Sequence, residues 1–253
     1  RTNIRRSVRP EFCQQCHTRE MSPEFATHGG EFLSEINHSA PPDLVAAGKE
    51  TRVSGRDGPV ALDLYVMSLC PYGMRAEAAL LPVVERLKSQ LQLNLYYIAD
   101  LAAEPTAPSR RVSSDDPPSA GRQGCAKSTS TGDGPFLSLH GQREIDESRR
   151  QLVLRADNPA QFIPYLLCRS RQGPAGAWTD CAETLGIDRE SLQSAALGDR
   201  GEELFRENIR MANQLGVDLS PTLRIDGAAY EGRIEPLSVL RYLCSRGLEH
   251  EHC

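Results

Sequence analysis

An apolar strand that runs into a cysteine–proline turn and then into an amphipathic helix constrains the fold of this chain most. Residues 60–67 are mostly apolar and rich in β-forming side chains, as in a strand that is buried on both faces. Cys70 and Pro71 follow, and residues 76–91 then repeat apolar side chains at helical spacing. A second apolar run, residues 93–98, completes a strand–helix–strand unit. This order predicts two parallel strands in an α/β domain.

The rest of the chain predicts one such domain over residues 59–253, with an inserted loop over residues 101–134 that is rich in Ser, Pro, Gly and Asp. Residues 1–58 are polar and interrupted by Gly and Pro, and they cannot bury a core of their own. The further elements that we expect are helices at 144–154, 159–169, 189–215 with a break near 198–201, and 234–244, and a strand at 219–227.

Charge and cysteine content narrow the class of protein. A net charge of −5 argues against a nucleic-acid partner, which requires a basic face. Eight cysteines favour an oxidising, periplasmic or extracytoplasmic location. The basic N-terminus has two interpretations, a solvated arm or an arm that lies on the anionic surface of a membrane; it contains Arg1, Arg5, Arg6 and Arg9. The sequence starts without Met, so we expect an upstream signal or anchor.

The N-terminal segment contains a C-x-x-C-H motif formed by Cys13, Cys16 and His17. In c-type cytochromes two thiols at this spacing bond to the vinyl groups of one haem, and the adjacent His binds the iron. A zinc half-site or a simple disulfide are the alternatives, but zinc needs a second Cys or His pair that the sequence does not place nearby. The motif therefore predicts one covalent haem c in a mostly irregular haem-binding segment.

A sixth iron ligand is expected from the same segment. His38 is the preferred residue, and His28 and Met21 are the alternatives. Met21 follows His17 closely and needs a loop to reach the opposite haem face, whereas the two histidines have more freedom. A segment without a core is best explained if it wraps a cofactor from both sides.

This segment resembles the first haem segment of membrane-anchored, quinol-oxidising cytochromes of the NapC/NrfH type. The resemblance rests on Phe12–His17, Phe32–Ser34 and Asn37–Ser39. That family carries four or more such motifs and this chain has one, so the resemblance implies one haem at most. It also implies a position next to a membrane, beside other redox protein subunits.

The order of strand, Cys70-Pro71-Tyr72 and helix is the active-site layout of thioredoxins. A cysteine at a helix N-terminus lies where the helix dipole and free N–H groups stabilise a thiolate. Ser220, Pro221 and Thr222 look like the cis-proline loop that faces this cysteine in the thioredoxin fold.

Residues 60–246 as a whole resemble the GILT-like and DsbA-like thiol oxidoreductases. The matching segments occur in order: Met67–Gly73, Leu139–Glu144, Phe162–Cys168, Trp178–Ala182, Leu185–Asp188 and Ser220–Thr222. The resemblance implies a thioredoxin fold with a helical insertion. It also implies a structural disulfide between Cys168 and Cys181, which would stabilise the fold by about 3 kcal/mol.

The chain departs from this family at the active site. The family dithiol is C-x-x-C, but Gly73 stands where the second cysteine belongs. Cys70 therefore cannot complete a dithiol–disulfide cycle with that position. Monothiol chemistry at Cys70, or a purely structural thiol, remains.

The sequence as a whole favours an extracytoplasmic monohaem c-type electron-transfer protein, associated with a membrane and part of an electron-transfer complex. In this interpretation the thioredoxin-like domain has lost its redox chemistry, and the protein is a carrier or subunit rather than a turnover enzyme. The alternatives are a monothiol disulfide oxidoreductase that uses Cys70, or a structural interaction subunit.

Overall fold

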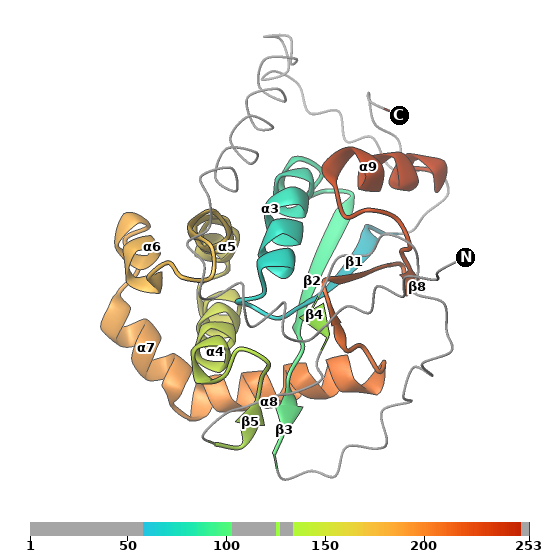
Figure 1. The fold of residues 1–253 in the computed structure, drawn as a ribbon. Coiled ribbons are helices and arrows are strands. Elements are labelled where there is room, and N and C mark those ends of the chain that lie inside the picture. Colours follow the sequence, from blue (N-terminus) through green and yellow to red (C-terminus); the bar gives the residue numbers. More distant parts are fainter. Residues whose placement is uncertain (1–57, 103–124, 127–133, 249–252) are drawn as a thin grey trace, which may run out of the picture.

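The computed structural model describes residues 58–102, 125–126, 134–248 and 253. A mixed four-stranded sheet forms the centre of this described part (Figure 1). Its strand order is β2 (Leu91–Tyr97), β1 (Val60–Val66), β7 (Thr222–Ile225) and β8 (Ala228–Ala229). β1 runs parallel to β2 and antiparallel to β7, and β8 runs antiparallel to β7.

The strand–helix–strand unit predicted from the sequence is present. Leu62, Leu64 and Val66 of β1 are fully buried, as expected for a central strand with helices packed around it. The connecting helix α3 spans Pro71–Arg86 and therefore begins five residues before the apolar repeat that predicts it at residue 76. Proline explains the early start, because its fixed φ and missing N–H suit the first helical position.

The elements around the sheet cover its face and its edge. Helix α9 (Pro236–Ser245) packs beside α3 (Figure 1). Helix α8 (Asp199–Gln214) packs against β2, the strand at the edge of the sheet. Its buried Asn208 accepts a hydrogen bond from the Tyr97 N–H at 2.7 Å and donates one to the Leu95 carbonyl at 3.2 Å. This side chain satisfies edge groups that would otherwise be free to pair with another strand.

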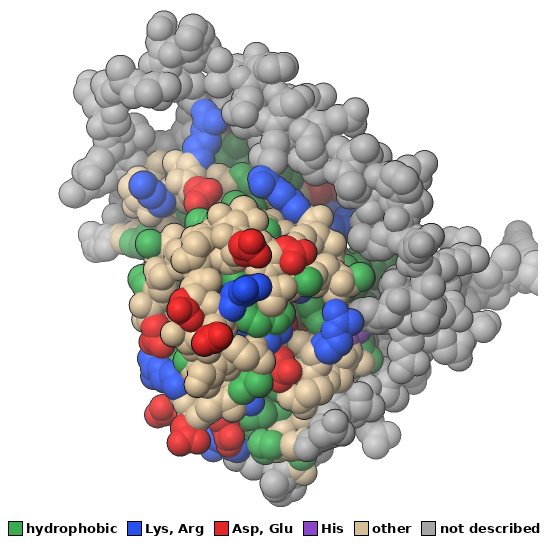
Figure 2. All heavy atoms as spheres, turned by 90° about the vertical axis from the view of Figure 1, so that its left-hand side faces the viewer, with side chains coloured by type: hydrophobic (Ala, Val, Ile, Leu, Met, Phe, Trp, Pro, Cys, Tyr) green, Lys and Arg blue, Asp and Glu red, His purple; other side chains and the backbone are tan. Residues whose placement is uncertain are grey.

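A helical insertion lies between the two halves of the sheet in sequence. It contains α4 (Gln142–Asp157), α5 (Pro159–Gln172), α6 (Trp178–Thr184) and α7 (Arg189–Leu197). The break predicted near residue 198 separates α7 from α8. The surface on the α6 and α7 side mixes acidic and basic side chains without a large patch of one sign (Figure 2). Helix α6 was not expected, since it is only seven residues long.

Two short ladders complete the described structure. β3 (Asp100–Leu101) pairs with β5 (Phe136–Leu137), and β4 (Cys125–Ala126) pairs antiparallel with β6 (Leu219–Ser220). β4 lies within residues 101–134, which the sequence analysis treats as an inserted loop. A strand of two residues has no hydrophobic period, so sequence patterning cannot find it.

The predicted α/β fold class with a helical insertion is confirmed. The division into residues 1–58 and 59–253 stays a prediction. Among the helices of the described part, none has the length and apolar character needed to cross a membrane.

Candidate functional site

Cys70 lies at the junction between β1 and α3, where it is the N-cap residue of the helix. Its backbone is extended, with φ −71° and ψ 123°, and its carbonyl accepts the first helical hydrogen bond from Met74 at 2.9 Å. The side chain is fully buried and is the free cysteine of the described residues. Its sulfur lies 3.8 Å from the Ser220 carbonyl oxygen, to which the thiol donates a hydrogen bond.

The surroundings of the Cys70 thiol act on its charge in opposite directions. Burial is the largest influence and raises the pKa of the thiol to about 11. Backbone hydrogen bonds from Gly73 and Tyr72, together with a hydrogen bond from the Ser220 side chain, act to lower that pKa. Nearby Glu144 adds a smaller upward effect on the pKa. The helix N-terminus therefore offers the groups that stabilise a thiolate, but burial keeps the thiol protonated.

The loop that faces Cys70 contains a cis peptide bond between Ser220 and Pro221. Pro221 joins β6 to β7, and the buried Ser220 hydroxyl accepts a hydrogen bond from the Met67 N–H at 2.9 Å. This bond ties the loop to the end of β1. Residues that are about 150 positions apart in the sequence are thus fixed against each other around the thiol.

Gly73 is the position that a second active-site cysteine would occupy. A Cβ built on Gly73 would lie 2.9 Å from Ser220 Oγ, 3.1 Å from the Met67 carbonyl oxygen and 3.2 Å from Val66 Cβ. The first separation is shorter than real Cβ contacts and the other two are unusually tight, so a side chain at this position would require its neighbours to shift. The cis-proline loop therefore packs against the helix where the missing side chain would stand.

Glu144 is a buried carboxylate directly beneath this junction. It accepts hydrogen bonds from the Leu69 N–H at 2.8 Å and from the Ser138 hydroxyl, and its Oε1 lies 2.8 Å from His140 Nδ1. Burial alone would raise the pKa of Glu144, but His140, Ser138 and Leu69 together hold it below its ordinary value. The carboxylate therefore anchors the turn before Cys70 to the start of α4.

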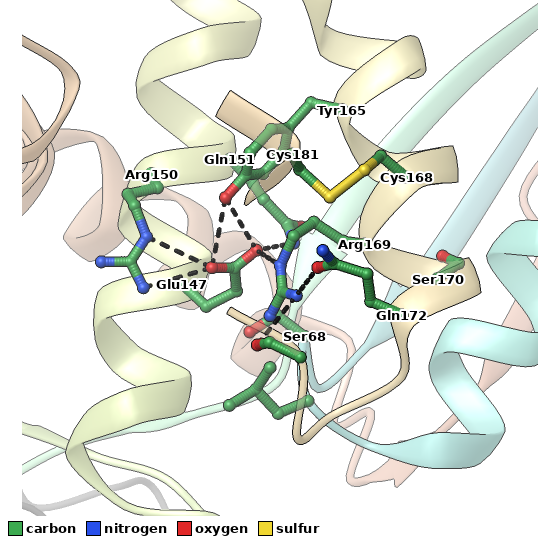
Figure 3. A network of polar contacts seen from close by, with 12 residues as sticks. Ser68, Glu147, Arg150, Gln151, Tyr165, Cys168, Arg169, Ser170, Gln172 and Cys181 are labelled. Atoms are coloured by element: carbon green, nitrogen blue, oxygen red, sulfur yellow. Dashed lines mark hydrogen bonds and ion pairs between the residues drawn. A yellow bond between two sulfur atoms is a disulfide. The ribbon is translucent and has the colours of Figure 1, made fainter. Parts of the chain in front are cut away.

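A second buried carboxylate, Glu147, holds the helical insertion together (Figure 3). It accepts hydrogen bonds from Arg169 Nε and Gln151 Nε2 at 2.9 Å and from Arg150 at 3.2 Å. Burial acts to raise the pKa of Glu147, but the two guanidinium groups outweigh it and lower that pKa. Next to this network, α5 and α6 are joined by the disulfide between Cys168 and Cys181, the pair that the family resemblance implies.

Two further cysteine pairings involve positions for which the sequence offers no partner. Cys244 and Cys253 form a disulfide at the end of the chain. Cys125 on β4 is also disulfide-bonded, and its other half lies outside the described residues. Cys13 and Cys16 are the cysteines of the sequence that lie outside the described residues.

Comparison with solved structures identifies the architecture. BdbD from Bacillus subtilis, in its oxidised form, aligns with a TM-score of 0.52 at 9% identity, covering 75% of this chain and 88% of BdbD. MdbA, a thiol-disulfide oxidoreductase from Actinomyces oris, aligns with a TM-score of 0.51 at 10% identity, covering 76% of this chain and 84% of MdbA. The chain has a DsbA-type thioredoxin fold. No family model and no curated protein matches its sequence.

This DsbA-type fold contradicts the main interpretation of the sequence, an electron-transfer protein built around one haem. The structural similarity is to thiol–disulfide oxidoreductases and favours the alternative that uses Cys70. The motif by itself does not decide the function, because C-x-x-C-H is also a pair of cysteines that can form disulfides.

The predicted haem-binding residues all lie outside the described part of the chain. They are Cys13, Cys16, His17 and the three alternative sixth ligands His38, His28 and Met21. Haem at these positions stays a prediction. The described residues contain no group of His, Cys, Asp and Glu side chains arranged to hold a metal ion.

Sequence reasoning identified Cys70 and the loop that faces it, but it missed two parts of the site. Cys125 was available only as one of several unassigned cysteines, and nothing in its Ser- and Gly-rich surroundings signals a strand. Glu144 belongs to the segment Leu139–Glu144 that carries the family resemblance, but the sequence does not show that its side chain is buried, at 1% exposed. A charged residue near a helix N-terminus carries no sequence signal for burial.

Proposed function

We propose that the protein performs thiol–disulfide exchange with Cys70 as its single nucleophile. The observation that carries this proposal is the position of Cys70: a free thiol at the N-terminus of α3, against the Ser220–Pro221 loop. A thiolate, not a thiol, attacks a disulfide, and a helix N-terminus favours the thiolate. The architecture shared with MdbA is consistent with this chemistry.

The resting thiol is protonated, so exchange requires that Cys70 becomes exposed. Burial is the largest influence on its pKa, which lies at about 11, while the hydrogen bonds from Gly73, Tyr72 and Ser220 oppose that rise. Opening the site removes the effect of burial and leaves the groups that lower the pKa. Access therefore controls reactivity at this site.

An oxidising, extracytoplasmic compartment suits this function. Disulfides persist in such compartments and are rare in the cytosol. The structure contains the Cys168–Cys181 and Cys244–Cys253 disulfides and a third that includes Cys125. Association with a membrane and with other redox subunits stays a prediction from the N-terminal sequence.

Exchange with glutathione disulfide tests the proposed function. The full chain is incubated with glutathione disulfide over a pH series, quenched with acid and examined by mass spectrometry for glutathione on the tryptic peptide 57–75, which contains Cys70. We expect the rate to rise with pH toward the thiol pKa of about 11 and to vanish in Cys70→Ser. A Cys70 that stays unmodified at every pH, in folded protein, contradicts the proposal.

A purely structural role for Cys70 is the second candidate, and the fully buried side chain favours it. The same experiment separates the two. A structural thiol reacts only when the chain unfolds, so its modification rate follows the unfolding rate measured in urea. A nucleophile behind a local opening reacts faster than global unfolding.

A further inference from the structure

Cys125 stands out in the described structure because its short strand, β4, pairs with the strand that contains Ser220, the residue that the Cys70 thiol contacts. β4 pairs antiparallel with β6, and the register sets Cys125 opposite Ser220. Ser220 is the residue whose carbonyl accepts the hydrogen bond of the Cys70 thiol. Both cysteines therefore contact the same residue, one through the strand ladder and one through its sulfur.

The two cysteines also share one buried environment. Each is 0% exposed, and both belong to a cluster that includes Tyr65, Met67 and Leu139. The two residues of β4 lie near the N-terminus of α3, which follows Cys70 (Figure 1). Within this cluster Cys70 is a thiol and Cys125 is half of a disulfide. A thiol and a disulfide held side by side are the two reactants of an exchange reaction.

β4 is a short extended segment that pairs through its main chain with β6, the strand before the cis-proline. Main-chain pairing of this kind gives affinity, and the side chains along the strand give specificity. Here the added strand comes from the chain itself. Its cysteine is brought to the nucleophile by the Cys125–Ser220 register rather than by diffusion.

We infer that Cys125 is the intramolecular exchange partner of Cys70 and supplies the second cysteine that position 73 lacks. This inference rests on the proposed function of Cys70 as a nucleophile. A side chain at position 73 would require its neighbours to shift, whereas β4 places a cysteine in the same buried cluster as the Cys70 thiol.

The exchange is balanced within the protein. Cys70 gives up its proton, and its thiolate attacks Sγ of Cys125. The bond between Cys70 and Cys125 forms as the bond between Cys125 and its former partner breaks. The former partner leaves as a thiolate and takes up the proton. One thiol and one disulfide are present before and after, so no external oxidant or reductant is consumed.

Disulfide mapping of the full chain tests the inference. Protein held at a series of pH values is quenched with acid, unfolded, alkylated and digested with trypsin without reduction. Cys70 lies in peptide 57–75, Cys125 in peptide 123–127, and Cys13 and Cys16 together in peptide 7–19. We expect peptide 123–127 to shift from a link with 7–19 to a link with 57–75 as pH rises. In Cys70→Ser the second link should be absent, while the Cys168–Cys181 link is unchanged.

A second variant keeps the test decisive if Cys70→Ser does not fold. In the double variant Cys13→Ser and Cys16→Ser, Cys125 has lost its former partner, and added glutathione disulfide serves as the oxidant. We expect a direct link between peptides 57–75 and 123–127, with two glutathione molecules released as thiols.

The outcomes separate this inference from the proposed function. If Cys70 accepts glutathione but never links to Cys125 in either protein, the inference is wrong and the proposed function stands. If Cys70 reacts with neither, both are wrong.

Discussion

Two buried regions of this protein shift the pKa values of their ionisable side chains in opposite directions. On α3, burial raises the pKa of Cys70 to about 11 and that of Glu77 to about 8. On α4, the equally buried Glu147 has a lowered pKa, because Arg169 and Arg150 surround it. Burial is thus similar in the two regions, and the supply of cations and donors differs.

This difference in charged partners distinguishes a structural carboxylate, Glu147, from side chains that can change their charge, Cys70 and Glu77. Glu147 is a fixed charge whose partners are all in place, so it ties α4 to α5. Burial favours the neutral forms of Cys70 and Glu77, and each gains charge when it becomes exposed or when pH rises past its raised pKa. A side chain that is poised in this way can respond to exposure, whereas a fully paired charge cannot.

Removing the paired charge of Glu147 should have the largest effect on stability. Glu147→Ala leaves two buried guanidinium groups without their carboxylate, and we expect the free energy of unfolding to fall by about 3–5 kcal/mol in a urea titration. Glu183→Ala is the matched control, because its ion pair with Arg189 is exposed and spans 4.0 Å, and little change is expected there. Equal, small losses in both variants would show that the Glu147 network does not hold the insertion.

Neutralising the poised carboxyl should have a smaller effect that depends on pH. Between its ordinary pKa of 4.5 and about 8, folded Glu77 keeps a proton that the unfolded chain has released, so stability falls as pH rises through this window. Glu77→Gln removes that loss. We expect equal stability below the window and, through it, a gain that grows by at most about 1.4 kcal/mol for each pH unit.

Urea titrations across this window compare Glu77→Gln with the parent chain. Ser170 donates to Glu77 Oε2 at 3.1 Å, and the glutamine can keep this contact, so the comparison isolates the charge. A difference between the two proteins that does not vary with pH would contradict the raised pKa of Glu77.

The smallest effect is expected at the missing active-site cysteine. Alanine in place of an exposed helical glycine usually stabilises a protein by up to about 1 kcal/mol. Gly73→Ala should instead destabilise by about 1 kcal/mol, because the added Cβ meets Ser220 Oγ and the Met67 carbonyl.

Thermal unfolding of Gly73→Ala measures this cost against Gly58→Ala, where a Cβ has nothing within 4 Å. A stabilised Gly73→Ala would mean that the cis-proline loop yields easily. In that event a cysteine at position 73 would also fit, and the need for Cys125 as a distant partner would weaken.

The sequence by itself determined the elements whose signals are local. The apolar run of β1, the proline at the start of α3 and the break at Gly198 each follow from side chains within a few residues of one another. Cys70 was identified in the same way, because the predicted strand, Cys70 and the predicted helix follow one another directly in the sequence. The C-x-x-C-H motif is equally local, and for that reason it could suggest a cofactor without testing it.

Only the tertiary structure decided the properties of the site. The burial of Cys70, the close contact at Gly73 and the placement of Cys125 all involve Ser220, which lies 95 to 150 positions away in the sequence. A pKa depends on the total of nearby charges, donors and solvent, and none of these is encoded next to the side chain that titrates. The sequence therefore identifies the Cys70 thiol, whereas the tertiary structure determines its protonation state and the groups that surround it.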